Sequence, residues 1–518
     1  MHNILNIITA TINLPSPWEG LGVGSSLSSF NLPSLWEGLG VGFISQDKAW
    51  SLCTVPFMVT FIVFFAIYLL LCRTRRTVMM GYVIAFSLFF AYKANGILML
   101  LLPATAVITW WLTKKMTAYE GWKRKLWLTL IIMQTLAPLI YYKYANFLLT
   151  TLNDIFAGNF ALLDIFLPIG ISFYTFQAIS YSVDVYKRKF TMETSLLEYS
   201  FYLTFFPLLM AGPITRAEVL IPQLKAEPRK DKELVYGGLW LIIVGLLKKA
   251  LIADYIAQYN NWIFDDPTTY SGFENLMGVF GYTLQIYCDF SGYSDMSIGL
   301  AAVMGFELKE NFNFPYQSLN MTEFWRRWHI ALSTWFRDYV YIPLGGNRKG
   351  KLRTYLNCMI TMLVSGLWHG ASWMFVLWGA IHGFGLVIHK ACKSWLDRIP
   401  NTIPVRFIAW LITFTYVTFA WIFFRAPNLD NAYAVINQIG TDFSWDYLVP
   451  FIKARPMWSV FVFLGLWLHT IRSNDYKWMQ NLFVKAPWIV KLIIFLIVMQ
   501  LVINFRQDNV QPFIYAQF

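Results

Sequence analysis

The chain has 518 residues, of which 57% are hydrophobic and 14% charged, against the roughly 25% charged residues of soluble globular proteins. With a mean hydropathy of +0.48, this composition excludes an ordinary soluble protein and indicates a polytopic membrane protein. The net charge of +12 does not indicate nucleic-acid binding, because the basic residues form short clusters between apolar runs, the pattern that orients membrane helices.

The first fifty residues differ from the rest of the chain. Residues 13–24 read NLPSPWEGLGVG and residues 31–42 read NLPSLWEGLGVG, a nearly perfect repeat. Two copies are too few for a repeat architecture, and the Gly, Pro and Ser content disfavours a helix. We therefore predict that residues 1–50 are a disordered extension, or spurious upstream sequence if translation starts near Met58. Residues 51–518 are predicted to form one membrane-embedded domain.

The first apolar segment, residues 53–72, ends at a basic cluster and predicts a retained membrane helix. Several later segments are shorter than the about 20 residues of a spanning helix, and several contain Pro or Gly. Broken or re-entrant helices are tolerated in a bilayer where they line an internal polar space. The sequence thus predicts an all-α fold with about ten to twelve transmembrane helices plus short re-entrant or interfacial helices. The later apolar segments are 79–92, 96–113, 126–150, 157–183, 198–217, 235–256, 273–304, 324–343, 355–378, 379–392, 404–425, 456–471 and 487–505.

Two carboxylates interrupt the apolar pattern between residues 287 and 300. Asp289 and Asp295 flank small polar residues in the segment YCDFSGYSDMSIGL. A lipid-facing helix does not tolerate two acidic side chains, so we expect both to face the protein interior.

The next polar motif is WRRWH at residues 325–329, which sets two arginines and a histidine among tryptophans. On a continuous helix, Trp325 and His329 would share one face. Arg326 and Arg327 have the fork geometry that grips phosphates of a cofactor or lipid. The alternative is an interfacial aromatic belt whose basic side chains reach the headgroups.

One histidine stands alone in an apolar run. Residues 361–380 read TMLVSGLWHGASWMFVLWGA, contain no Lys, Arg, Asp or Glu, and are long enough to cross a bilayer. An ionisable side chain at that depth marks a functional site. A buried imidazole stays neutral and keeps a ring nitrogen that accepts a proton, so His369 suggests base chemistry inside the membrane. His329 is its expected partner; the alternative is two unrelated buried histidines bonded to backbone.

No metal site is expected. His382 and His389 are seven residues apart on one helix face, about 10 Å, which is too far to share one ion. The chain has no HExxH motif and no CxxC pair among its five cysteines.

Long segments spread over the chain carry a known pattern. They read LPIGISFYTFQAISYSVDVYKRK (167–189), FFPLLMAGPITRA (205–217), YCDFSGYSDMSIGLAAVMGF (287–306), FWRRWHIALSTWFRDYVYIPLGGNRKG (324–350) and LVSGLWHGASWMFVLWGAIHG (363–383). Together they resemble the hallmark segments of the membrane-bound O-acyltransferases. Within that family the match is to the bacterial branch that O-acetylates alginate and other exported polysaccharides. The branch that D-alanylates teichoic acids is less similar.

The resemblance implies roles for the residues singled out above. His369 matches the family's presumed catalytic base, and His329 matches its second polar residue. The family fold is a ring of tilted helices around a thinned centre, with a cytoplasmic tunnel for the acyl donor and an opposite opening for the acceptor. Arg326 and Arg327 would favour an anionic donor on the cytoplasmic side.

The expected activity is acetyl transfer from acetyl-CoA, as a substrate and not a tightly bound cofactor, toward hydroxyls of an exported polysaccharide. A periplasmic or extracellular acetyl-relay protein is a further expected partner, membrane lipids surround the chain, and the expected location is the bacterial cytoplasmic membrane. The alternatives are D-alanyl transfer to a cell-wall polymer, or a transporter or flippase in which the histidines relay protons. The absence of a pseudo-repeat between the halves of the sequence disfavours a transporter.

Overall fold

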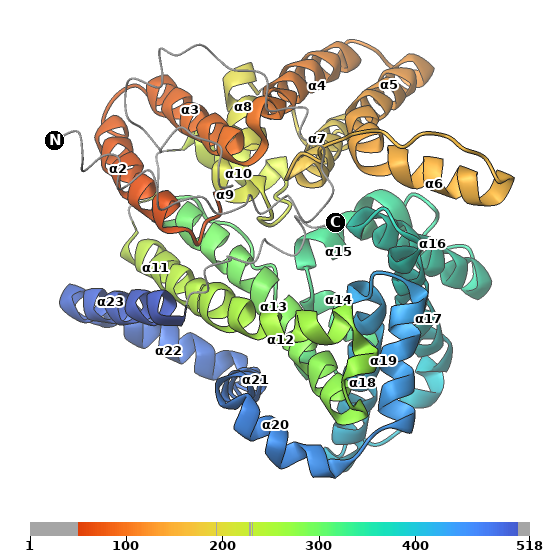
Figure 1. Cartoon of the computed structure of the whole chain (residues 1–518). Helices are drawn as coiled ribbons and strands as arrows, with labels where there is room; N and C mark the ends of the chain where they lie inside the picture. The colour runs from red at the N-terminus through yellow and green to blue at the C-terminus, as the bar shows by residue number, and fades with distance from the viewer. Residues whose placement is uncertain (1–49, 193, 227–228, 230, 506–518) are drawn as a thin grey trace, which may run out of the picture.

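The computed structural model describes residues 50–192, 194–226, 229 and 231–505. Apart from Trp50, the extension predicted at residues 1–50 lies outside this part of the chain. Throughout the described residues the secondary structure is helical, without a strand, which confirms the all-α prediction (Figure 1).

The helices divide into three groups along the chain. The first group is α2 (Val55–Leu71), α3 (Arg76–Asn95), α4 (Leu101–Thr117), α5 (Gly121–Leu139), α6 (Ala145–Phe156), α7 (Ile171–Tyr186), α8 (Leu196–Thr204), α9 (Phe206–Leu209) and α10 (Ala217–Lys225). The second is α11 (Lys232–Leu246), α12 (Asp254–Asp265), α13 (Gly272–Val303), α14 (Met321–Arg327), α15 (Ile330–Phe336), α16 (Lys351–His369) and α17 (Trp373–Leu396). The third is α18 (Ile403–Arg425), α19 (Leu429–Thr441), α20 (Leu448–Ala454), α21 (Pro456–Leu468), α22 (Ser473–Lys485) and α23 (Trp488–Phe505).

Among the described residues, six helical stretches are long and apolar enough to cross a membrane, or seven if one pair bent by 106° counts as one span. This number is smaller than the ten to twelve expected, because other apolar segments form helices that are shorter or more polar. The chain is a multi-pass membrane protein. The six stretches are Arg76–Thr117, Gly121–Phe156, Lys232–Asp265, Trp373–Leu396, Ile403–Arg425 and Trp488–Phe505.

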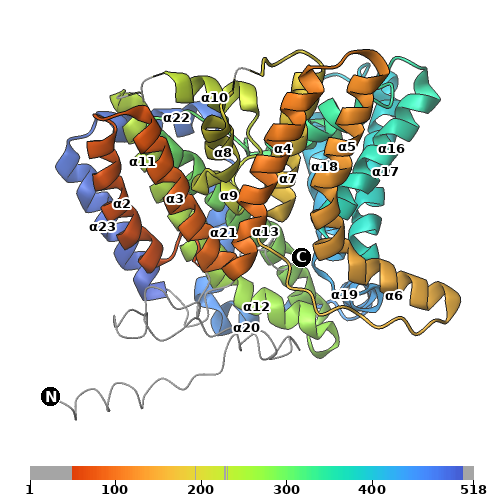
Figure 2. The same ribbon diagram turned by 90° about the horizontal axis from the view of Figure 1, so that it is seen from above.

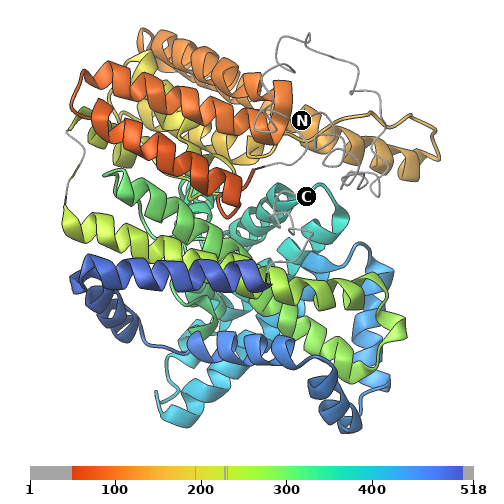
Figure 3. The same ribbon diagram turned by 60° about the vertical axis from the view of Figure 1, so that its left-hand side comes forward.

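Helix α13 is the central element. A capping box, in which Ser271 and Glu274 bond each other's backbone N–H groups, starts the helix. Glycines let α13 approach α11 closely: a Cβ on Gly238 or on Gly245 would lie within 2.7 Å of a carbonyl oxygen of α13. On its outer side α11 is covered by α23, which runs along it as the dark-blue helix of Figure 3.

Helices α16 and α17 form a hairpin of the same close kind. A Cβ on Gly366 would lie 2.2 Å from the Phe375 oxygen, and one on Gly379 would lie 2.4 Å from the Met362 oxygen. Figure 2 shows α4, α5, α16 and α17 running between the same two faces of the molecule, while α6 lies across one of these faces. The hairpin therefore fixes where α16 ends.

The core consists of two aromatic-rich clusters. One contains Phe290, Trp335 and Trp368 and extends into the first group of helices. The other contains Trp328 and Trp378 and extends into α12, α18 and α21. Because α13, α14–α15 and α16–α17 contribute to both, the clusters meet around these helices.

Candidate active site

His369 is the last residue of α16 and is 1% exposed. Its imidazole packs edge-on against three rings, with centroid distances of 4.9 Å to Trp378, 5.1 Å to Trp368 and 5.5 Å to Phe424. Both core clusters thus contact this one side chain. The aromatic walls exclude bulk water and keep the imidazole neutral.

The end of α16 is held by the segment that follows α5. Lys143 Nζ donates to the carbonyl oxygens of Trp368 at 2.8 Å and His369 at 3.0 Å, and the Tyr144 hydroxyl donates to the Leu367 oxygen at 2.9 Å. The last carbonyls of a helix have no partner within it, and a cation there complements the negative end of the helix dipole. Lys143 and Tyr144 therefore fix the backbone that carries His369.

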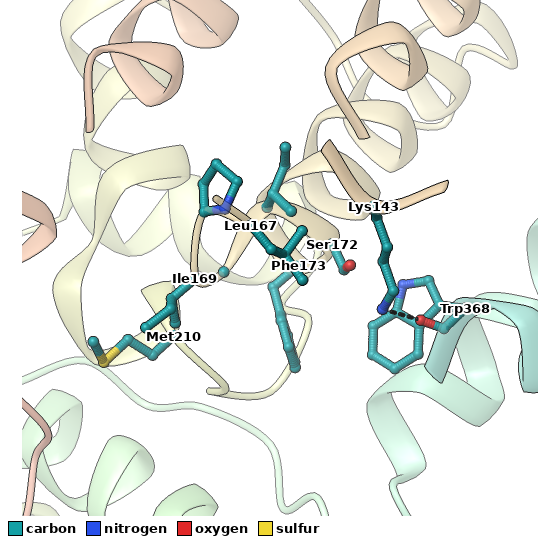
Figure 4. Close-up of a pocket in the computed structure, with 10 residues that line it drawn as sticks. Lys143, Leu167, Ile169, Ser172, Phe173, Met210 and Trp368 are labelled. Carbon is teal, nitrogen blue, oxygen red and sulfur yellow. Dashed lines mark hydrogen bonds between the residues drawn. The ribbon is translucent and has the colours of Figure 1, made fainter. Parts of the chain in front are cut away.

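A narrow pocket, with ≈ 30 Å³ of free space, opens beside this helix end (Figure 4). Lys143, Trp368 and Ser172 line it, together with the loop at residues 167–170 that leads into α7 and with Met210. Figure 4 shows Lys143 reaching from the segment after α5 to the Trp368 carbonyl at the edge of this space. The pocket lies at the ends of α5 and α16, opposite to their basic starts.

His329 lies between α14 and α15 and is 0% exposed. Its backbone is left-handed, with φ 43° and ψ 57°, and Trp328 before it is extended. The chain therefore leaves the helix at this point. The expectation that Trp325 and His329 share the face of one helix is wrong, because two short helices meet here and the left-handed residue redirects the imidazole inward.

The two expected histidines lie near each other. The ring of Trp368 contacts both, with centroid distances of 6.1 Å to His329 and 5.1 Å to His369. His329, Lys143 and His382 are the ionisable groups that act on His369 electrostatically. His329 also packs edge-on against Phe290 of α13, at 4.6 Å. The two buried imidazoles thus lie within one group of aromatic rings, Phe290, Trp368, Trp378 and Phe424, which we call the chamber. A buried neutral imidazole can accept a proton from a hydroxyl.

A second pocket, with ≈ 230 Å³ of free space, lies further along α16, toward the start of that helix. Ser365, one turn before His369, and Thr361 line it from α16, while Arg337 and Lys390 add two cations. This pocket and the one beside Lys143 therefore lie at different levels along α16, with His369 just beyond both sets of lining residues.

The predicted arginines have different surroundings. Arg327 Nε donates to Glu323 at 3.0 Å, and its Nη1 donates to the Asn313 carbonyl at 3.2 Å. Arg326 is exposed, and its charge lies near enough to His389 to act on that imidazole. Arg327 thus holds a loop, whereas the Arg326 guanidinium is accessible at the surface.

Asp289 and Asp295 face the interior, as expected for acidic residues on a membrane helix. Lys248 Nζ donates to Asp295 at 2.7 Å, and Lys249 Nζ donates to Asp254 at 2.7 Å and also bonds Asp289. These buried ion pairs tie α13 to the segment between α11 and α12.

The other histidines form no metal-binding cluster within the described residues. His389 instead shares a hydrogen bond of 2.8 Å with the Thr322 hydroxyl. His382 is 0% exposed and packs against Trp378 at 4.6 Å.

Two residues of this site escaped the sequence interpretation. Lys143 could have been found, because it is a cation within the apolar run 126–150 and such residues mark functional positions. Asn311, which hydrogen-bonds His329 Nδ1 at 3.0 Å, lies in a polar loop where nothing in the sequence distinguishes it.

Residues 86–429 match the model of the membrane-bound O-acyltransferase (MBOAT) family. The chain is 43% identical to the probable alginate O-acetylase AlgI of Azotobacter vinelandii, over 64% of this chain and 67% of that protein. It is 38% identical to the peptidoglycan O-acetyltransferase of Helicobacter pylori, over 68% and 71%. It is more distantly similar to the teichoic acid D-alanyltransferase of Bacillus subtilis, with 27% identity over 49% of this chain and 68% of that protein.

Proposed function

The chain belongs to the membrane-bound O-acyltransferase family, and on this premise we propose that it transfers acetyl from acetyl-CoA to hydroxyls of an exported polysaccharide, with His369 as general base. One observation carries the proposal: His369 is buried at the end of a helix that one pocket lines at Trp368, beside that end, and another lines up to Ser365, one turn earlier.

The charge pattern supports an orientation for these pockets. Helix α5 begins beside Lys123 and Lys125, and α16 begins at Lys351 beside Arg348 and Lys349. By the positive-inside rule these starts lie on the cytoplasmic side. The pocket with Arg337 and Lys390 would then receive acetyl-CoA from the cytoplasm of a bacterial inner membrane, with Arg326 attracting its phosphates.

The Lys143 pocket, at the opposite ends of both helices, would receive the acceptor. Its position on the outer side suits a growing glycan or a periplasmic or extracellular protein that relays the acetyl group. With this assignment, donor and acceptor reach His369 from opposite sides of the membrane.

The chemistry follows from the weak nucleophilicity of a hydroxyl. Neutral His369 takes the hydroxyl proton as the oxygen attacks the thioester carbon; a C–O bond forms and the C–S bond breaks. His369 then returns the proton to the leaving thiolate, so atoms and charge balance. His329 lies close enough to orient the acceptor or to stabilise the oxyanion.

Acetyl is favoured over D-alanyl as the transferred group. The relatives named as O-acetylating enzymes are 38–43% identical to this chain, whereas the D-alanyltransferase is 27% identical. Their names refer to alginate and to peptidoglycan, both outside the cytoplasm. A polysaccharide acceptor is common to the two.

The test is the O-acetyl content of cell-surface glycan in a strain that lacks the gene and carries variants of it. His369→Ala should lower incorporation by about 10²-fold or more, and His329→Ala should also lower it, because both remove a group from the transfer chamber. His469→Gln is the matched control, since that buried histidine accepts from the Tyr316 N–H and lines neither pocket. Unchanged acetyl content in both chamber variants would rule out the assignment.

A further inference from the structure

Asn311 connects the start of α15 to the imidazole of His329. It is 1% exposed and lies in the loop after α13. Its backbone oxygen accepts from the Ile330 N–H at 2.9 Å, and its side-chain Oδ1 accepts from the Ala331 N–H at 3.2 Å. Asn311 therefore bonds the first N–H groups of α15 from a separate segment. His329 is the N-cap residue of this helix, but its side chain does not cap it.

These bonds fix the orientation of the Asn311 amide. A backbone N–H can only donate, so the atom that Ala331 contacts is the oxygen. The amide nitrogen, Nδ2, donates to the Ser294 hydroxyl of α13 at 3.0 Å. With Oδ1 facing His329 Nδ1 at 3.0 Å, the Nδ1 atom must be the donor.

A neutral imidazole carries one proton, so Nε2 of His329 holds the lone pair. Within the described residues, this buried Nε2 has no hydrogen-bond partner. A buried polar atom without a partner is costly, and at a functional site it marks the place of a substrate group. Phe290, which packs edge-on against the ring at 4.6 Å, has no polar atom to offer this nitrogen.

We propose that Asn311 is a positioning residue that locks His329 in its Nδ1–H tautomer, so that Nε2 accepts a hydrogen bond from the acceptor. This inference rests on the proposed function and selects between the two roles given to His329. An unprotonated Nε2 cannot donate to an oxyanion, so His329 orients the acceptor. The group bound is a second O–H of the acceptor, next to the hydroxyl whose proton His369 removes, which favours sugars with adjacent hydroxyls.

The tautomer can be measured without any substrate. Solid-state NMR of protein labelled with ¹³C,¹⁵N-histidine in liposomes distinguishes a protonated Nδ1 from a protonated Nε2, and the His329→Asn variant identifies the signal. The expected result is that His329 of the unaltered protein is protonated at Nδ1 alone. In Asn311→Ala, His329 should show a mixture of the Nδ1–H and Nε2–H tautomers. A protonated Nε2 in the unaltered protein would overturn the proposal.

Kinetics provide the second measurement, with [¹⁴C]acetyl-CoA and de-O-acetylated alginate oligosaccharide as the probes. Asn311→Ala should lower kcat/KM about tenfold, through loss of one directing hydrogen bond. Asn311→Asp keeps the acceptor oxygen and should stay within about threefold at pH 8. Its carboxylate favours the imidazolium, which has no lone pair, so the acid limb of its pH profile should move to higher pH.

Asn275 gives the matched control, because its fully buried amide Nδ2 donates to the backbone carbonyls of Pro267, Tyr270 and Ser271, and no histidine is among these partners. Asn275→Asp should leave the pH profile in place, and an equal shift in both Asp variants would contradict the proposal. If the unaltered protein acetylates none of the probe, the proposed function fails in this assay, and the NMR result alone decides on Asn311.

Discussion

His369 and His329 are held in place by different means. The first ends a helix, and hydrogen bonds from Lys143 and Tyr144 fix the carbonyls around it. The second sits in a left-handed backbone conformation between two short helices, a costly state that surrounding contacts must maintain. Asn311 provides those contacts. Both imidazoles are therefore positioned by residues from other parts of the chain.

Lys143→Met tests the support of His369. Loss of two charge-assisted hydrogen bonds releases the end of α16, and a small displacement of a catalytic group is costly, so acetyl transfer should fall about tenfold or more. Lys491→Met is the matched control, because that lysine bonds the Val484 carbonyl from α23, away from the histidines. Equal turnover numbers for the two purified variants would contradict a specific role for Lys143.

At the level of single residues, the sequence predicts a functional role where a residue differs in polarity from its neighbours. His369 is the one ionisable group in an apolar run, so its importance follows from the cost of placing it there. Asn311 lies among polar residues, and its partner is 18 positions away. The break between α14 and α15 is equally hidden, because WRRWH contains no Pro or Gly to announce it.

Among the elements, each π-helical segment presents cations that pair with buried groups or line a pocket. Ile140–Tyr144 presents Lys143, Leu247–Ala253 presents Lys248 and Lys249, and Arg337–Tyr341 presents the Arg337 that lines the larger pocket. A π segment inserts an extra residue into a helix and changes the direction of its side chains, which makes it frequent at functional sites. Pro138 precedes the first segment and accounts for its break. The other two follow no proline within their helices, so the sequence did not predict them.

The α16–α17 hairpin is sensitive to a single methyl group. Gly379→Ala would place a Cβ 2.4 Å from the Met362 oxygen, so the helices must separate, at a cost of about 1–3 kcal/mol. Thermal unfolding should therefore begin at lower temperature, and transfer should fall because α16 carries His369. Gly81→Ala is the control: a Cβ there meets nothing within 4 Å, and alanine favours the helix. A melting temperature unchanged in both variants would contradict the close packing.

On the scale of the whole molecule, the site lies where two aromatic clusters meet, at the end of a helix that lines two pockets. Composition predicted a membrane protein, and the long apolar runs predicted helices, because a helix satisfies its own backbone hydrogen bonds in lipid. The number of spans was harder to predict, since apolar stretches such as residues 157–183 divide into a loop and a buried helix. Hydropathy describes transfer into lipid and does not separate lipid-facing helices from buried ones.

The most direct measurement uses sealed membrane vesicles of both orientations and [¹⁴C]acetyl-CoA, which does not cross membranes. Vesicles with the cytoplasmic face outward should transfer label to glycan inside them, whereas right-side-out vesicles should not. The His369→Ala variant should be inactive in both orientations. Label transfer from the non-cytoplasmic face, or transfer that persists at the normal rate in His369→Ala, would contradict a base at the junction of a cytoplasmic donor pocket and an outer acceptor pocket.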